Sequence, residues 1–190
     1  MQDIRTERRH ALERPSGFFA GLGRFRRDRS GASALEFALV AFPLILLLLA
    51  ALEVGIVYFA NFSLENATAQ GARLIRTGQA QSQKFDAAQF KSEVCKHLSP
   101  PISCSGVRLD VQHFSKFGDA SLTSPLDGNG NLKTSFAYEP GDPSEVVIVR
   151  AFYEWSVTAK LPKQIGLSNM PNGNRLLAAT AAFRNEPYKK

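Results

Sequence analysis

Residues 31–60 have the sequence GASALEFALVAFPLILLLLAALEVGIVYFA. No charged residue occurs from Phe37 to Leu52, and Glu53 is the only charge between there and Ala60. The hydrocarbon core of a bilayer is about 30 Å thick, and an α-helix of about 20 apolar residues crosses it. Because backbone polar groups in lipid must be paired within the segment, only a helix suits this stretch. The sequence therefore predicts one transmembrane helix over residues 32–60, in which Pro43 removes a single hydrogen bond.

A basic arm precedes this apolar segment. Residues 1–31 carry eight Arg and four acidic residues, a net charge of +4 out of +6 for the whole chain. The arginines nearest to the apolar segment are Arg24, Arg26, Arg27 and Arg29. Basic residues beside a span favour the cytoplasmic side, whereas binding of nucleic acid or anionic lipid is the alternative use of such a cluster. We expect a cytoplasmic N-terminus and a domain on the far side of the membrane from residue 61 onward.

The apolar segment is too long for a removed secretory signal, and no good A-x-A site follows it. Instead, Gly31 followed by Glu36-Phe37 and a long apolar helix resembles the processing site of type IV pilins and pseudopilins. Together with residues 69–73 (AQGAR) and 181–188 (AAFRNEPY), this segment resembles the TadE-like minor pseudopilins of the tight-adherence (Flp) pilus of bacteria and archaea. The resemblance implies that a prepilin peptidase cuts between Gly31 and Ala32 at the cytoplasmic face of the membrane.

Glu36 is the first acidic residue after this cleavage site. A carboxylate that enters a bilayer is costly and commonly functional, and here it lies near the positive end of the helix dipole. After cleavage the new α-amino group of Ala32 would lie four residues before Glu36. It could pair with the Glu36 of its own chain or with the Glu36 of a neighbouring subunit. The resemblance implies that Glu36, with Phe37, sets subunit register during assembly. A capping box formed by Ser33 and Glu36 is the alternative.

The helix is predicted to continue from Asn61 to Thr77, with Arg76 and Gly78 as its stop signal. Unbroken, it would be roughly 70 Å long, although a break near Asn61 is an alternative. Glu53, about 25 Å along the helix from Glu36, is either solvated at the far interface or in contact with a partner helix. Ala67 and Gly71 are small residues on an apolar face and predict a close helix–helix contact.

The only two cysteines, Cys95 and Cys104, lie near the end of a predicted second helix. That helix begins with a capping box at Asp86–Gln89 and ends before Pro100-Pro101. An even cysteine count on the predicted oxidising side of the membrane indicates one disulfide, with two free thiols as the alternative. His97 is close by, but two Cys and one His do not complete a metal site. We predict no metal and no cofactor.

The rest of the chain has the alternation that is typical of strands. Strands are expected at residues 107–112, 132–138, 146–159 and 176–185, and helix competes in the last because of its Ala content. Residues 127–131 (DGNGN) match the first half of an EF-hand loop, but Leu132 and Tyr138 stand where Gly and Glu are required, so we expect a hairpin turn. The predicted fold class is α+β, with an antiparallel sheet of about four strands packed on helices.

No catalytic motif occurs, and no nucleic-acid-binding module is present, so we expect neither an enzyme nor a nucleic-acid-binding protein. Three domains are expected: a cleaved leader (1–31), a transmembrane helix (32–60) and a periplasmic α+β domain (61–190). The helix is expected to cross the bacterial inner membrane once. The implied partners are a prepilin peptidase, other pilins and pseudopilins, inner-membrane assembly proteins of the pilus, and lipid. The alternatives are an uncleaved single-span scaffold of the pilus machine and a membrane-tethered binding domain.

Overall fold

The structure is a computed structural model that describes residues 31–157 and 168–188, and the chain divides into two units, 1–47 and 48–190. The arginines before Gly31, and Thr158 and Ala159 of a predicted strand, lie outside the described residues. The described part of the first unit is Gly31 and the beginning of helix α2 (Ala32–Arg76). Nearly all its side chains are exposed.

Helix α2 continues through Pro43 and Asn61 without interruption, so the alternative of a break near Asn61 is wrong. From Val57 onward one face is buried. The helix ends at Arg76, and Gly78 follows in the left-handed conformation with φ of 74°. The stop signal in the sequence is therefore confirmed, because glycine adopts this conformation without steric cost. A one-turn helix, α3 (Gln79–Ser82), follows directly.

The second predicted helix is α4 (Ala87–Cys95). Its capping box is confirmed, because the Asp86 side chain accepts from the Gln89 N–H at 2.7 Å and the Gln89 side chain accepts from the Asp86 N–H at 3.0 Å. The disulfide between Cys95 and Cys104 is also confirmed, with the two Cα atoms 5.5 Å apart. A short 3-10 helix, η1 (Cys104–Gly106), then leads into the sheet.

The sheet has three antiparallel strands in the order β1 (Arg108–Phe114), β2 (Val146–Trp155), β3 (Arg175–Arg184). The predicted strand at 132–138 is wrong, because only isolated bridges form at Leu132 and Tyr138. The Asp127 carboxylate accepts the N–H groups of Asn129 and Asn131 at 2.9 Å each. These bonds close the 127–131 turn. On its two sides Leu126 and Leu132 form an antiparallel bridge, and the Lys133 N–H donates to the Pro125 carbonyl at 3.0 Å, so the expected hairpin turn is present. A second 3-10 helix, η2 (Phe117–Asp119), follows β1.

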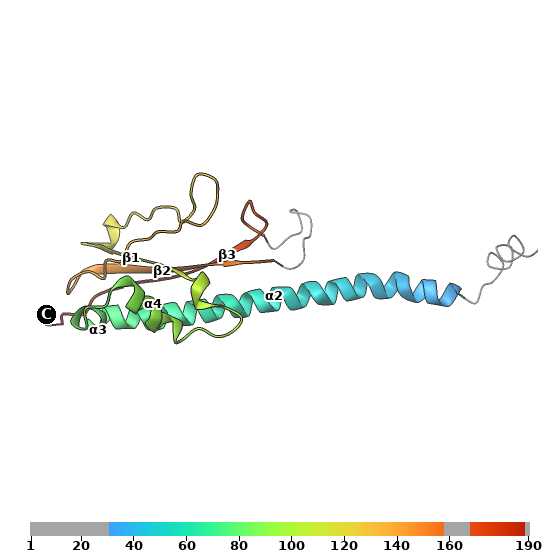
Figure 1. Cartoon of the computed structure of the whole chain (residues 1–190), viewed down its shortest axis with the longest axis horizontal. Helices are drawn as coiled ribbons and strands as arrows, with labels where there is room; N and C mark the ends of the chain where they lie inside the picture. Colours follow the sequence, from blue (N-terminus) through green and yellow to red (C-terminus); the bar gives the residue numbers. More distant parts are fainter. Residues whose placement is uncertain (1–30, 158–167, 189–190) are drawn as a thin grey trace, which may run out of the picture. The chain divides into compact units, whose positions relative to one another are not determined.

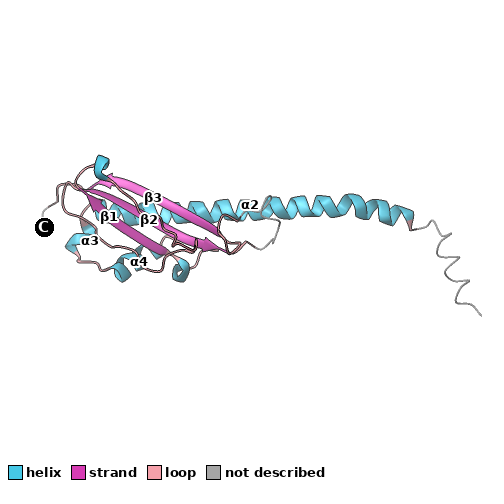
Figure 2. Cartoon of the chain, turned by 90° about the horizontal axis from the view of Figure 1, so that it is seen from above, coloured by secondary structure: helices cyan, strands magenta, loops and turns pink. Residues whose placement is uncertain are grey.

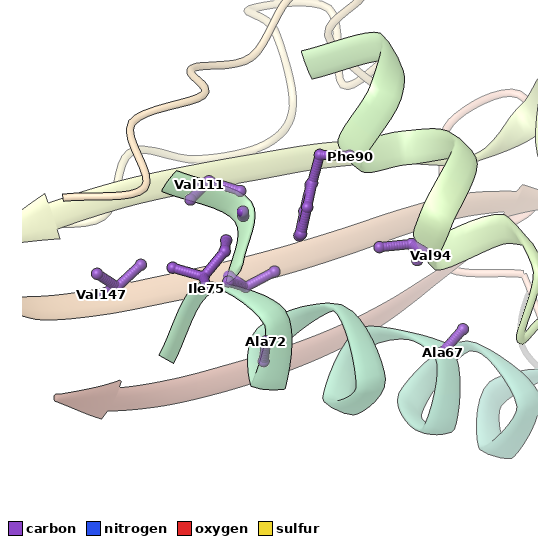
Figure 3. Close-up of a cluster of buried hydrophobic side chains, with 9 residues drawn as sticks. Ala67, Ala72, Ile75, Phe90, Val94, Val111 and Val147 are labelled. Atoms are coloured by element: carbon purple, nitrogen blue, oxygen red, sulfur yellow. The ribbon is translucent and has the colours of Figure 1, made fainter. Parts of the chain in front are cut away.

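Figure 1 shows α3, α4 and the second part of α2 on one face of the sheet, and the connection between β1 and β2 over the other face; Figure 2 shows the strands lying along α2. The first of two core clusters packs Phe90 and Val94 of α4 against Ile75 of α2 and the valines of β1 and β2 (Figure 3). The second core cluster packs Val57 and Leu64 of α2 against Ile102 and against residues in, or next to, each of the three strands.

The opposite face of the sheet buries one ion pair. Asp110 and Arg150 are register partners in β1 and β2, and their side chains are 2% and 8% exposed. Arg150 Nε and Nη2 both donate to the Asp110 carboxylate, and Nη1 donates to the Thr123 carbonyl at 3.0 Å. The pair therefore ties the long connection after β1 to the sheet, and its hydrogen bonds offset the cost of removing two charges from water.

Candidate functional site

The predicted cleavage site lies where α2 begins. Gly31 precedes the first helical residue, Ala32, and its carbonyl accepts the Leu35 N–H at 3.1 Å. Each residue from Gly31 to Phe37 is exposed, and a Cβ added to Gly31 would meet no atom within 4 Å. The peptide bond between Gly31 and Ala32 is therefore not covered by any of the residues that the structure describes.

Glu36 lies on this first part of α2, four residues after Ala32 and on the same side of the helix. Helix α2 begins at Ala32, so Ser33 lies inside the helix rather than at the N-cap position of a capping box with Glu36. Phe37 is 73% exposed. The arrangement leaves a carboxylate and an aromatic side chain at the beginning of an apolar helix, without a described side chain covering them.

Ala67 and Gly71 lie instead in the core. A Cβ placed on Gly71 would be 2.5 Å from Val94 Cγ2 and 3.2 Å from Phe90 Cζ. The close approach that the small residues predict is therefore occupied by α4 of the same chain. Ala67 is fully buried in the same cluster (Figure 3). Glu53 is partly buried and has an interaction partner within the chain.

Sequence reasoning missed a contact between α2 and the loop after α4. The Ser99 N–H donates to Ser63 Oγ at 2.8 Å, and Ser63 Oγ is 3.4 Å from the Ser99 carbonyl. Beside this contact, Pro100 and Pro101 line a groove along α2. The prolines were interpreted only as the end of the second helix, whereas α4 already ends at Cys95. No signal in the sequence pairs Ser63 with Ser99, because 36 residues separate them.

A depression of about 620 Å³ lies between α3 and the segment before β2. His113 is there, with Nδ1 3.5 Å from Glu139 Oε2 and Nε2 3.9 Å from Glu145 Oε2. Tyr188 also lines it, and burial, followed by the nearby Asp142 and Glu145 carboxylates, raises the pKa of this phenol. Among residues 31–157 and 168–188, no three His, Cys, Asp or Glu side chains are grouped as metal ligands.

One helix of the described chain, α2, is long and apolar enough to cross a membrane. Residues 31–73, which include the helix start, the apolar segment and the first buried turns, match the family model of TadE-like proteins. No curated protein and no solved structure matches the chain. The match begins at the glycine before the helix and continues to the residues that pack against α4. Together with the single apolar helix, the match shows that residues 31–73 of the chain are similar to TadE-like proteins.

Proposed function

We propose that this chain is a minor pseudopilin of the tight-adherence pilus. In this proposal a prepilin peptidase cuts between Gly31 and Ala32, and the mature protein acts in pilus assembly, initiation or surface adhesion. The observation that carries the proposal is the TadE-like match, which begins at Gly31. The exposure of residues 31–37 supports it, because a peptidase needs an accessible bond at this position.

The proposed topology places the leader in the cytoplasm, α2 across the inner membrane and the α+β domain in the periplasm. The arginines before Gly31 support the cytoplasmic leader, since basic flanks stay inside. The Cys95–Cys104 disulfide supports an oxidising compartment for the domain. The proposed partners are the peptidase, other pilins and pseudopilins, and the assembly proteins of the inner membrane.

Mass spectrometry of the protein from its own cells tests processing. We expect the mature chain to begin at Ala32, and a chain that begins at Met1 to accumulate when the prepilin peptidase is deleted. Intact leader in cells with active peptidase would contradict the proposal. It would favour an uncleaved scaffold that stays in the membrane.

The role of Glu36 is tested separately from processing. We expect Glu36→Ala to be cleaved and inserted normally but to be lost from the assembled pilus fraction, because the carboxylate can no longer pair with an α-amino group. Ser33→Ala is the matched control, since it changes a neighbouring polar residue on the same helix turn and should assemble. Shear fractionation with quantitative immunoblotting measures both. Normal assembly of Glu36→Ala would remove this role from the proposal.

A further inference from the structure

An apolar groove of about 850 Å³ runs between α2 and the loop 99–102. Its walls include Leu48, Leu52, Ile56 and Phe59 from α2, and Pro100 and Pro101 from the loop. Ile56 and Phe59 are 47% and 52% exposed, and both prolines are exposed. We propose that this loop is embedded in the membrane leaflet next to the domain, and that phospholipid acyl chains fill the groove. The inference rests on α2 as the membrane anchor of the proposed function.

The position of the groove along α2 indicates its depth. An apolar helix crosses the hydrocarbon core with about 20 residues, and counted from Phe37 these end near Ile56. Leu48, Leu52 and Ile56 therefore belong to the last turns of the span. Because Pro100 and Pro101 line one groove with these three residues and Phe59, they lie beside the end of the span. Glu53 comes four residues before the buried Val57, and so faces the domain rather than the groove.

The backbone N–H groups of the loop are compatible with an apolar environment. Irregular backbone is excluded from lipid chiefly because unpaired polar groups cannot find partners there. In this loop the Ser99 N–H donates to Ser63 Oγ at 2.8 Å, and the Ile102 N–H donates to the Ser99 carbonyl at 3.2 Å. Between them, Pro100 and Pro101 have no N–H at all. The segment 99–102 therefore presents no unpaired N–H donor to the leaflet.

The loop is also held in place from both sides. Ser63 fixes it to α2, and the Cys95–Cys104 disulfide closes the chain around it. Ile102 is 7% exposed and anchors the loop in the second core cluster with Val57 and Leu64. The two prolines are thus the exposed part of a rigid loop. Embedding them in lipid would fix the depth and the tilt of the domain relative to the membrane.

Fluorescence quenching by brominated lipids tests the proposal on the full chain. Trp155 is the only tryptophan, so the Trp155→Phe variant has no tryptophan fluorescence. In this background a single reporter tryptophan is introduced by Pro100→Trp in one variant and by Phe117→Trp in a second variant, which is the matched control. Phe117 is 56% exposed and follows the end of β1 that pairs with Val146, away from the groove. The proteins are reconstituted in phosphatidylcholine vesicles with or without bromine on the acyl chains.

We expect brominated lipid to reduce the emission of Pro100→Trp at least twofold, and that of Phe117→Trp by less than a tenth. If the protein floats with the vesicles but brominated lipid does not quench the emission of Pro100→Trp, the insertion of the loop is overturned and the membrane anchor is not. Failure to float would instead contradict the membrane anchor and with it the proposed function. Because Pro100→Trp alters the loop, Ser99→Trp serves as a second reporter that keeps both prolines, and the same quenching is expected.

The protein-to-lipid ratio separates lipid from a second copy of the chain as the occupant. With acyl chains in the groove, quenching is unchanged when the protein is diluted tenfold in lipid. If quenching appears only on dilution, another copy covers the groove at high density, and the lipid proposal is overturned.

Discussion

Gly71 is a position in α2 where the lack of a side chain lets α4 pack closely. A Cβ there would lie 2.5 Å from Val94 Cγ2, so Gly71→Ala must push α4 away from α2. We expect the variant to lose about 1–3 kcal/mol of stability, because overpacking a dense core forces side chains and backbone to shift. Gly55→Ala on the same helix is the control, since its Cβ would meet nothing within 4 Å. Urea unfolding in detergent micelles measures both, and equal stabilities would contradict the packing argument.

Tyr138 makes the stability of the domain depend on pH in the alkaline range. Burial, and then the nearby Asp86 carboxylate, raise the pKa of this phenol to about 12. In the unfolded chain a tyrosine ionises near pH 10. The neutral phenol therefore stabilises the fold fully below about pH 10, and this contribution is lost as the pH rises through about 12.

The Tyr138→Phe variant should remove that part of the alkaline destabilisation. Its stability at pH 7 should stay close to that of the parent, because the Tyr138 hydroxyl has no hydrogen-bond partner in the described structure and the ring still packs against Phe90. Unfolding curves at pH 7, 10 and 12 measure the difference. A parallel loss of stability in parent and variant between pH 10 and 12 would show that other groups cause it.

At the scale of elements, the Cys95–Cys104 bridge joins the end of α4 to η1 around the loop 99–102. The entropy of closing a loop of this length predicts that the bridge stabilises the fold by about 2.5–3 kcal/mol. We expect Cys95→Ser with Cys104→Ser to show this loss in urea unfolding, and reductant to cause the same loss in the parent. A double variant as stable as the oxidised parent would mean that Ser63 and Ile102 alone hold the loop.

The sequence correctly predicted the features that depend only on residues close to one another in the chain. The capping box at Asp86 and Gln89 and the glycine stop after Arg76 depend on neighbouring residues, and both form. The strand expected at 132–138 failed because alternation does not create a partner strand. Strand β1 meets this segment through the backbone bonds of Val111 with Ala137 and Glu139, at 2.9 Å each, which are too few to form a strand. The loop's contact with Ser63 was not predictable, since it depends on how α4 packs on α2.

At the scale of the whole molecule, the apolar stretch and the residues after Gly31 were sufficient to predict a helix long and apolar enough to cross a membrane and the likeness to TadE-like proteins over residues 31–73. The same stretch could not predict what covers the small residues further along. Ala67 and Gly71 predicted a close helix–helix contact, and the packing of Phe90 and Val94 shows that the contact is with α4 of the same chain. The roles of Glu36 and of the Gly31–Ala32 bond depend on other proteins, so they remain predictions.

The residues after β3 connect the end of the long helix to the sheet and to the segment before β2. Asn185 is 2% exposed, and its Nδ2 donates to the carbonyls of Pro140 and Asp142 at 3.0 Å each. The next residue, Glu186, donates its N–H to the Arg76 carbonyl at 2.9 Å, which pairs a free carbonyl at the end of α2. Its side chain forms only a surface ion pair with Arg76, at 3.7 Å and about half exposed.

These two side chains allow a comparison within one segment. Asn185→Ala leaves two carbonyls without their donor in a buried position, and we expect it to cost about 1–3 kcal/mol. Glu186→Ala keeps the backbone bond to Arg76 and removes only the exposed ion pair, so it should cost no more than about 1 kcal/mol. Urea unfolding of both variants in the same micelles measures the difference. If Glu186→Ala were the more damaging, charge pairing rather than buried hydrogen bonding would hold the helix end to the sheet.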